Sequence, residues 1–192
     1  MNQKKIAVFG DLTALYDAKS EFKKNINYSL LDKSIKDYFA VKSLSCARFY
    51  TLYHPENQSQ VDFVKMLETT VNWEVVTKRP SEVRRVSNTG NPHKNYRFDA
   101  QIAYNIGECT GEDYDSIVVI TDSIELLRPL VEAKKYIGNE NSANNTVNVA
   151  FFSDAMDHRW WRGLKESNIN FIDLGEIMYN SRNQRPDDMT SA

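Results

Sequence analysis

Apolar residues recur along the chain in two spacings, one typical of buried strands and the other of helices. Residues 6–9 form a short apolar run closed by Gly10 and Asp11, which predicts a buried strand whose carboxyl end opens into a turn. Residues 28–39 carry apolar side chains at helical spacing and predict a helix. The same two spacings predict further strands at 41–53, 73–77, 117–121, 147–152 and 171–174, and further helices at 61–67, 98–106, 124–137 and 160–165.

Strands and helices alternate in this pattern, which favours a parallel sheet because crossover helices place successive strands in the same direction and bury both faces of the sheet. The expected fold class is therefore α/β, a three-layer sandwich with a mainly parallel central sheet. A chain of 192 residues with 41% apolar side chains is long enough for one well-filled core but short for two. We expect a single domain over residues 1–178, with residues 179–192 as a flexible tail.

Several familiar sites are missing from the sequence. The chain has no GxGxxG or GxxxxGK[ST] loop for phosphates, no GxSxG nucleophile motif and no HExxH zinc motif. Its two cysteines, Cys46 and Cys109, lack the spacing of metal ligands, so we expect reduced thiols with a structural role. No apolar stretch approaches the roughly 20 residues that cross a bilayer, and the amino terminus has no signal-peptide core. We expect a cytoplasmic protein without a membrane partner.

Three aspartates stand where a parallel sheet of this kind binds ligands, beyond the carboxyl ends of the strands. Asp11 follows the first strand, Asp122 follows the strand at 117–121, and Asp99 begins a helix. Carboxylates that converge repel one another, whereas Mg²⁺ or Mn²⁺ is satisfied by a few carboxylates and water. The set predicts a divalent-metal site, with Glu125 as a secondary fourth ligand.

Each of these acids also has a simpler, local interpretation. Aspartate is common in turns and at helix N-caps, so Asp122 could cap the helix that follows it and Asp99 could only stabilise a helix dipole. Glu125 could be an exposed glutamate in a first helical turn. The metal-site interpretation depends on all the acids meeting at one place.

Four successive segments of the chain resemble the signature blocks of the NYN branch of the PIN-like nuclease fold. These segments are IAVFGDLTALYDA, KNYRFDAQIAYNI, IVVITDSIELLRPLVEAKKYIG, and VNVAFFSD followed by NINFIDL. The resemblance spans roughly residues 5–175 and implies a PIN-like fold. It also implies that Asp11, Asp99 and Asp122 bind Mg²⁺ or Mn²⁺ for the cleavage of RNA.

The chain departs from that family pattern at two positions and in one stretch. Ala14 stands where the family usually has an asparagine, and Asn105 stands where a second aspartate often follows the one in the lysine-containing block. The usual SGDxDF-like stretch is loosened here to TDSIELL, in which Glu125 could replace the second acid. These departures weaken the constellation of metal ligands that the resemblance implies.

A basic loop precedes Asp99. Residues 78–97 hold seven basic or potentially basic side chains against one acid, and this loop could bring phosphate contacts to the acidic pocket through Arg84, Arg85, Lys94 and Arg97. Because a local basic patch can bind RNA on a protein whose net charge is only -2, the loop favours an RNA partner. A solvated charged loop is the alternative.

The leading hypothesis is metal-dependent hydrolysis of RNA phosphodiester bonds, in which Asp11, Asp99 and Asp122 are catalytic through the metal they hold. The alternative is a catalytically weakened NYN-type module that binds RNA or protein, with a protein partner or self-association in place of catalysis. A small-molecule phosphatase ranks last, because Asp11 lacks the Asp-x-Asp pair of phosphoaspartate enzymes.

Overall fold

The computed structural model describes residues 4–23, 25–83, 97–112, 114–137 and 146–183 of the chain. Its centre is a six-stranded sheet in the order β3-β2-β1-β4-β5-β6, and every pair of neighbouring strands is parallel. The strands are β1 (Ile6–Asp11), β2 (Cys46–Leu52), β3 (Glu74–Lys78), β4 (Ser116–Ile120), β5 (Thr146–Phe151) and β6 (Asn170–Asp173). The α/β three-layer class predicted from the sequence is confirmed.

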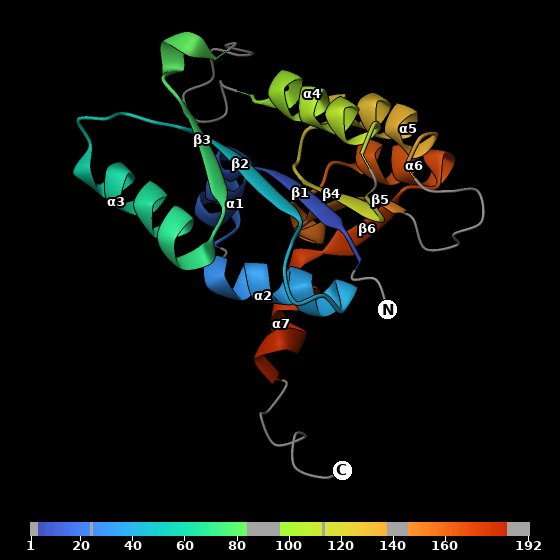
Figure 1. Ribbon diagram of the computed structural model, residues 1–192, viewed down its shortest axis with the longest axis horizontal. Helices are drawn as coiled ribbons and strands as arrows, with labels where there is room; N and C mark the ends of the chain where they lie inside the picture. The colour runs from blue at the N-terminus through green and yellow to red at the C-terminus, as the bar shows by residue number, and fades with distance from the viewer. Residues whose placement is uncertain (1–3, 24, 84–96, 113, 138–145, 184–192) are drawn as a thin grey trace.

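Helices cover both faces of this sheet (Figure 1). One layer holds α1 (Leu12–Phe22), α2 (Tyr28–Phe39), α3 (Gln58–Met66) and α7 (Leu174–Asn183), and the other holds α4 (Asp99–Cys109), α5 (Leu127–Lys134) and α6 (His158–Ser167). A π-helical turn, Leu67–Val71, extends α3, and short 3-10 turns lie at Pro80–Glu82, Ile124–Leu126 and Ser153–Ala155. No helix in the described part of the chain is long and apolar enough to cross a membrane.

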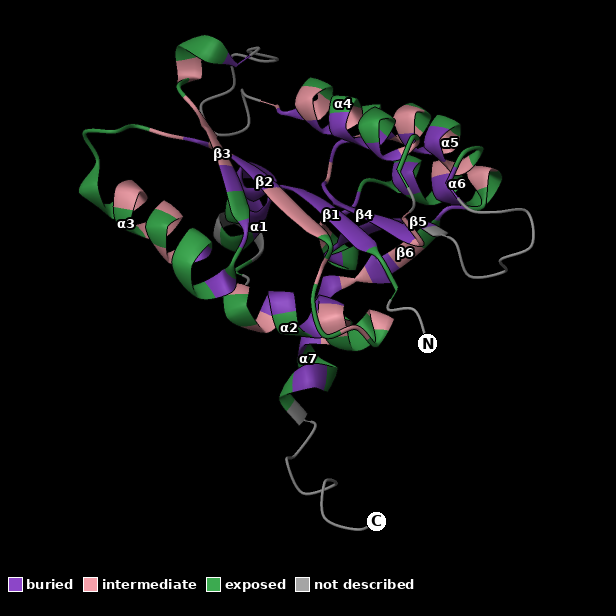
Figure 2. Ribbon diagram, viewed as in Figure 1, coloured by how far each residue is buried: buried purple, intermediate pink, exposed green. Residues whose placement is uncertain are grey.

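The central strands lie in the core because their sequences are apolar at successive positions. Every residue of β1 and β4 is buried (Figure 2), as expected for parallel strands with helices on both sides. At the end of β1, Gly10 lies against the ring of Phe49, which stacks on Trp73 with a centroid distance of 3.8 Å. A Cβ on Gly10 would lie 2.3 Å from Phe49 Cε1, so only glycine fits there without movement.

Helix α1 follows β1 without a loop and occupies residues to which the hydrophobic pattern assigns no element. Asp11 caps it: its Oδ1 accepts hydrogen bonds from the backbone N–H groups of Thr13 at 2.8 Å and Ala14 at 3.2 Å. The apolar side chains of Leu12, Leu15 and others on this helix are buried. The last residue of the first strand therefore also begins the first helix.

Three predicted boundaries need correction. The expected tail from residue 179 begins inside α7, which continues to Asn183. Within this part of α7, the hydroxyl of the buried Ser181 donates a hydrogen bond of 3.1 Å to Asp37 Oδ2 on α2. Residues 184–192 lie outside the described residues. The predicted strand at 41–53 begins only at Cys46, because α2 ends at Phe39 and is capped by Ala40 at a φ of 53°. The predicted helix at 124–137 is a 3-10 turn followed by α5.

Candidate acidic site at the switch point of the sheet

The strand order places a switch point between β1 and β4. The chain moves outward from β1 through β2 to β3, then crosses to β4 and continues outward on the other side. Crossover connections diverge at such a point, and ligands bind there beyond the carboxyl ends of the strands. Asp11 is the last residue of β1, and Asp122 follows β4 after one intervening residue. The two aspartates thus follow the two strands that form the switch point.

Asp11 is almost completely buried, with 1% of its surface exposed. Its Oδ1 atom is used in the cap of α1, whereas Oδ2 has no hydrogen-bond partner among the described residues. Burial, and next the charge of Asp122, raise the pKa of Asp11 to about 7, although Arg97 and the two backbone N–H groups favour the charged form. The carboxyl group is therefore part protonated near neutral pH.

Asp99 is the first residue of α4 and is half-buried. Its Oδ2 accepts a hydrogen bond of 2.8 Å from the hydroxyl of Ser123, and its Oδ1 is buried without a partner in the described part of the chain. Burial raises the pKa of Asp99, while Ser123 and Arg97 partly oppose that shift. Asp99 thus resembles Asp11 in having one satisfied and one unsatisfied carboxylate oxygen.

Asp122 is held from two directions. Its Oδ1 accepts a hydrogen bond from Arg97 Nη1 within an ion pair, and its backbone carbonyl accepts one of 2.9 Å from the indole N–H of Trp160. Trp160 is fully buried, as expected for a core tryptophan, whereas Trp161 is 41% exposed and lies edge-on to Phe171. The buried indole fixes the backbone that carries Asp122.

Arg97 is the common counter-charge of the site. Burial disfavours its charged form, but the carboxylates of Asp122, Asp11 and Asp99 outweigh that effect and raise its pKa. The structure therefore brings the three predicted aspartates within electrostatic reach of one guanidinium. Arg97 pairs with Asp122 in this structure, and its expected contact with RNA phosphates stays a prediction. The other three basic residues predicted to bind RNA lie outside the described residues: Arg84, Arg85 and Lys94.

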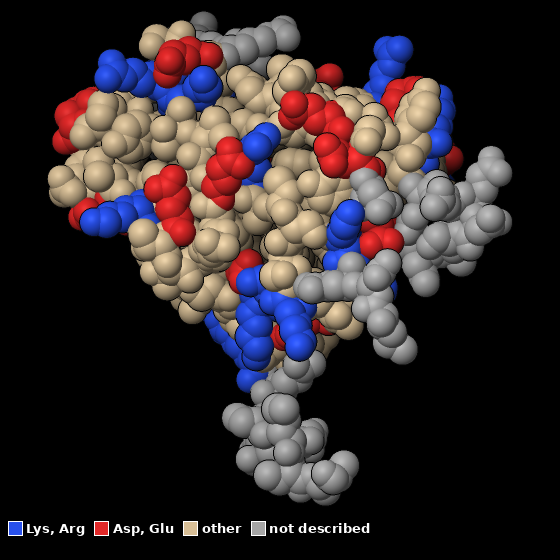
Figure 3. All heavy atoms as spheres, viewed as in Figure 1, with Lys and Arg blue, Asp and Glu red and all other residues tan. Residues whose placement is uncertain are grey.

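A cavity of about 520 Å³ opens beside Arg97, Asp99 and Asp122, whereas the buried Asp11 is not among its lining residues. Arg97, Asp99 and Asp122 line it, and two exposed side chains of opposite charge, Glu125 and Arg159, stand among its other lining residues. Glu125 comes from the 3-10 turn Ile124–Leu126. Acidic and basic side chains are interspersed over the face of the molecule in Figure 3, so neither sign dominates that surface. A charged ligand would therefore depend on the local groups of the cavity.

The two departures from the family pattern have different surroundings. The backbone N–H of Ala14 donates a hydrogen bond to Asp11 Oδ1. Asn105 lies on α4 within another network, in which it accepts a hydrogen bond from the Tyr50 hydroxyl and donates one of 2.7 Å to Glu108. Asn105 lines a different, more open cavity beside Arg48 and Tyr50. Its side chain therefore serves a buried polar contact between α4 and β2.

The donor set has the chemistry of a site for a hard divalent cation, because carboxylate oxygens are the ligands that Mg²⁺ and Mn²⁺ prefer. The unsatisfied oxygens of Asp11 and Asp99 could accept such an ion. In the arrangement described, however, no three Asp, Glu, His or Cys side chains among the described residues form a group that could hold a metal. The guanidinium of Arg97 supplies the positive charge instead.

Sequence reasoning missed three groups that shape the site: the ion-pair role of Arg97, the hydroxyl of Ser123 and the indole of Trp160. Ser123 could have been noticed because it adjoins Asp122 in the sequence. The contacts of Arg97 and Trp160 join residues 25 and 38 positions away from Asp122. No local pattern indicates pairs at such separations.

Comparison with known proteins supports the fold. No protein-family model matches the chain, and no curated protein matches it. A crystal structure of a protein of unknown function from Vibrio parahaemolyticus is similar, with a TM-score of 0.64 and 18% sequence identity, over 89% of this chain and 93% of that chain. This likeness shows a shared fold that extends over nearly the whole of both chains.

Proposed function

We propose that this chain is a metal-dependent ribonuclease that hydrolyses RNA phosphodiester bonds at the site of Asp11, Asp99 and Asp122. The observation that carries the proposal is the pair of buried carboxylate oxygens, one on Asp11 and one on Asp99, that have no hydrogen-bond partner in the described structure. Leaving such an oxygen buried and unsatisfied is costly in free energy. A divalent cation would satisfy both atoms and offset the repulsion from Asp122.

Each residue of the site has its own role in the proposed reaction. Asp11, Asp99 and Asp122 would hold Mg²⁺ or Mn²⁺, with Glu125 at the exposed rim of the cavity. When bound, the ion polarises a phosphate and lowers the pKa of water. Arg97 pairs with Asp122 when no ion is present, and its planar guanidinium also matches a phosphate group. We infer that Arg97 exchanges its carboxylate partner for a substrate phosphate when a cation takes over the charge of Asp122.

The proposal implies a definite pH dependence. Because the pKa of Asp11 is raised to about 7, cation binding must displace a proton at and below neutral pH. Mn²⁺ affinity should therefore strengthen as the pH rises through 7. Cleavage at a fixed, subsaturating Mn²⁺ concentration should rise over the same range.

The second candidate is a module that binds RNA or protein without catalysis. The ion pair of Arg97 with Asp122 favours it, since this pair already compensates charge at the site in the absence of a metal. In this case the acidic cavity would be a remnant, and the chain would act through a protein partner, self-association or RNA binding alone.

Cleavage of an end-labelled, unstructured RNA of mixed sequence in Mn²⁺ tests the proposal. We expect the wild type to cleave and EDTA to stop it, and we expect Asp11→Asn and Asp122→Asn to lose activity by on the order of 100-fold or more. Asp62→Asn, an exposed carboxylate on α3, is the matched control and should cleave like the wild type. Circular dichroism checks that each variant is folded.

Mn²⁺ binding, followed by electron paramagnetic resonance, separates the two candidates without relying on activity. A wild type that neither binds Mn²⁺ nor cleaves a varied panel of RNAs, but still binds RNA in EDTA, would establish the noncatalytic module instead. Binding of one or two ions that both aspartate variants lose supports the nuclease.

A further inference from the structure

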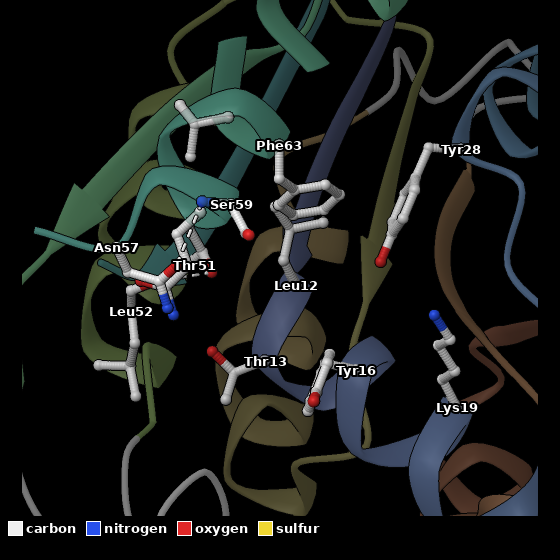
Figure 4. Close-up of a pocket in the computed structure, with 12 residues that line it drawn as sticks. Leu12, Thr13, Tyr16, Lys19, Tyr28, Thr51, Leu52, Asn57, Ser59 and Phe63 are labelled. Atoms are coloured by element: carbon white, nitrogen blue, oxygen red, sulfur yellow. Dashed lines mark hydrogen bonds between the residues drawn. The ribbon is translucent and has the colours of Figure 1, made fainter. Parts of the chain in front are cut away.

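A third cavity, of about 460 Å³, lies on the side of the sheet covered by α1 and α3 (Figure 4). We call it the Phe63 pocket; its walls include Leu12, Thr13, Tyr16, Lys19, Tyr28 and Phe63, with the end of β2 and the start of α3 completing it. Its volume falls within the range of about 300–1,000 Å³ that is usual for small-ligand sites. Since Leu12 and Thr13 directly follow Asp11, the pocket lies at the same edge of the sheet as the acidic site.

Aromatic and aliphatic side chains form the middle of the Phe63 pocket. In Figure 4, Phe63 and Leu12 lie at its centre, and Tyr28 and Tyr16 stand on one side. The rings of Tyr28 and Phe63 meet edge-on with centroids 5.2 Å apart. Rings presented in this way to an open cavity suit a flat aromatic ligand, because stacking and edge contacts add to the burial of apolar surface.

Hydrogen-bonding groups surround this apolar middle. Thr13 is 4% exposed, and its hydroxyl is buried without a partner among the described residues. Asn57 caps α3 by accepting a hydrogen bond of 3.1 Å from the backbone of Ser59, so the first turn of α3 borders the cavity. Burial raises the pKa of the Tyr28 hydroxyl to about 12, so this group is protonated at neutral pH and can donate a hydrogen bond. A flat ligand with several polar atoms on its edge fits this rim.

The charge of the pocket favours an anion. Of the twelve lining residues, Lys19 is the one with a formal charge, and no acid is among them. In Figure 4 the ammonium group of Lys19 points toward the hydroxyl of Tyr28, on the side opposite Asn57 and Ser59. The amino-terminal end of α3 adds a partial positive charge on that opposite side. A cationic or purely aliphatic ligand would leave these groups unused.

We propose that the Phe63 pocket binds one unpaired nucleotide of the RNA strand, with its base among Tyr16, Tyr28 and Phe63 and a backbone phosphate near Lys19. This inference rests on the proposed function for its choice of RNA as the source of the nucleotide; a free mononucleotide offers the same chemistry. Because the pocket and the acidic site both begin at the end of β1, a strand seated in the pocket can continue toward the carboxylates. The pocket then selects single-stranded over paired RNA, whose bases are stacked and unavailable.

Binding of a fluorescein-labelled single-stranded RNA heptamer, measured by anisotropy in EDTA, tests the pocket while no cleavage occurs. We expect Phe63→Leu, which keeps an apolar side chain but removes the ring, to weaken binding by about ten-fold. Lys19→Gln should lower the slope of log affinity against log salt by about 0.7. Lys65→Gln is the matched control, because Lys65 is an exposed lysine of α3 that does not line the pocket, and it should leave the affinity unchanged.

Competition identifies the part of the strand that is recognised. AMP should displace the heptamer and ribose 5-phosphate should not, since only AMP carries a base. If Phe63→Leu and Lys19→Gln both bind the heptamer like the wild type, the proposal is overturned; Lys19 is exposed, so its variant remains informative even if Phe63→Leu fails to fold. If AMP binds through Phe63 but the heptamer does not bind, the ligand is a free nucleotide and the RNA strand is ruled out.

The same variants distinguish this inference from the proposed function. If the wild type does not cleave RNA in Mn²⁺ but Phe63→Leu binds the heptamer more weakly than the wild type, the nuclease is refuted and the nucleotide pocket is supported. If the wild type cleaves the heptamer in Mn²⁺ and both pocket variants have the same KM as the wild type, the nuclease is supported and the pocket is refuted.

Discussion

Replacing Asp11 with asparagine should change how stability depends on pH. The free energy of unfolding of Asp11→Asn, relative to that of the wild type, should increase as the pH rises. Asp11 is buried, and its pKa is raised from 3.8 to about 7. Between these values the folded protein holds a proton that the unfolded chain has released, so the free energy of unfolding of the wild type falls as the pH increases. Asparagine does not titrate, and the variant lacks this contribution.

The size of the effect follows from the pKa difference. The interval from 3.8 to about 7, at about 1.4 kcal/mol for each pKa unit, corresponds to about 4 kcal/mol. The difference in unfolding free energy between Asp11→Asn and the wild type should therefore shift by about 4 kcal/mol in favour of the variant from pH 4 to pH 8. Most of that shift should fall between pH 4 and pH 7.

Urea unfolding in EDTA, followed by circular dichroism from pH 4 to pH 8, measures this difference. Asp62→Asn, the exposed control, should follow the wild type throughout. Mn²⁺ at 100 times its Kd should stabilise the wild type by about 2.7 kcal/mol at pH 8 and leave Asp11→Asn unchanged. A stability difference that does not vary with pH would refute the assignment of Asp11 as a buried carboxyl with a raised pKa.

Three further substitutions test the surroundings of the site. Arg97→Gln should lower the unfolding free energy in EDTA at pH 8 by about 2–3 kcal/mol, because three carboxylates lose their counter-charge. The same variant should bind Mn²⁺ more strongly in a titration; weaker Mn²⁺ binding would contradict the view that Arg97 competes with the cation. Gly10→Ala places a methyl group 2.3 Å from Phe49 Cε1 and should cost about 1–3 kcal/mol, which an unchanged urea midpoint would disprove. Trp160→Phe removes the indole donor to the Asp122 carbonyl and should cost about 1–3 kcal/mol; Trp161→Phe is the exposed comparison, and equal losses in the two variants would argue against a special role for the buried indole.

The class of fold could be predicted because its signals are local. The continuous apolar runs at 6–9 and 117–121 indicate strands buried on both faces, and the helical spacing between such runs indicates crossovers. The ends of these runs also place Asp11 and Asp122 beyond the strands. The sequence predicted two aspartates at one edge of the sheet because each of them stands at, or one residue beyond, the end of a strand.

Helix α1 was not predicted because its apolar residues indicate a helix only weakly in the sequence. Leu12 and Leu15 are buried against the rest of the core, and the residue that caps the helix, Asp11, was expected to lie in a turn after the first strand. Helix α7 was likewise not predicted: Ser181 and Asp37 are 144 positions apart, so their hydrogen bond depends on α7 packing against α2.

Sequence by itself determined the strands, the helices from α2 to α6 and the acidic residues at the strand ends, because each depends on neighbours a few positions away. Tertiary structure decided the strand order, the pairing of Arg97 with Asp122 and the raised pKa of Asp11. The physical reason is that charge, burial and hydrogen bonding at the site come from segments far apart in the chain. Their combined effect on a carboxylate exists only once β1, β4 and the start of α4 have packed together.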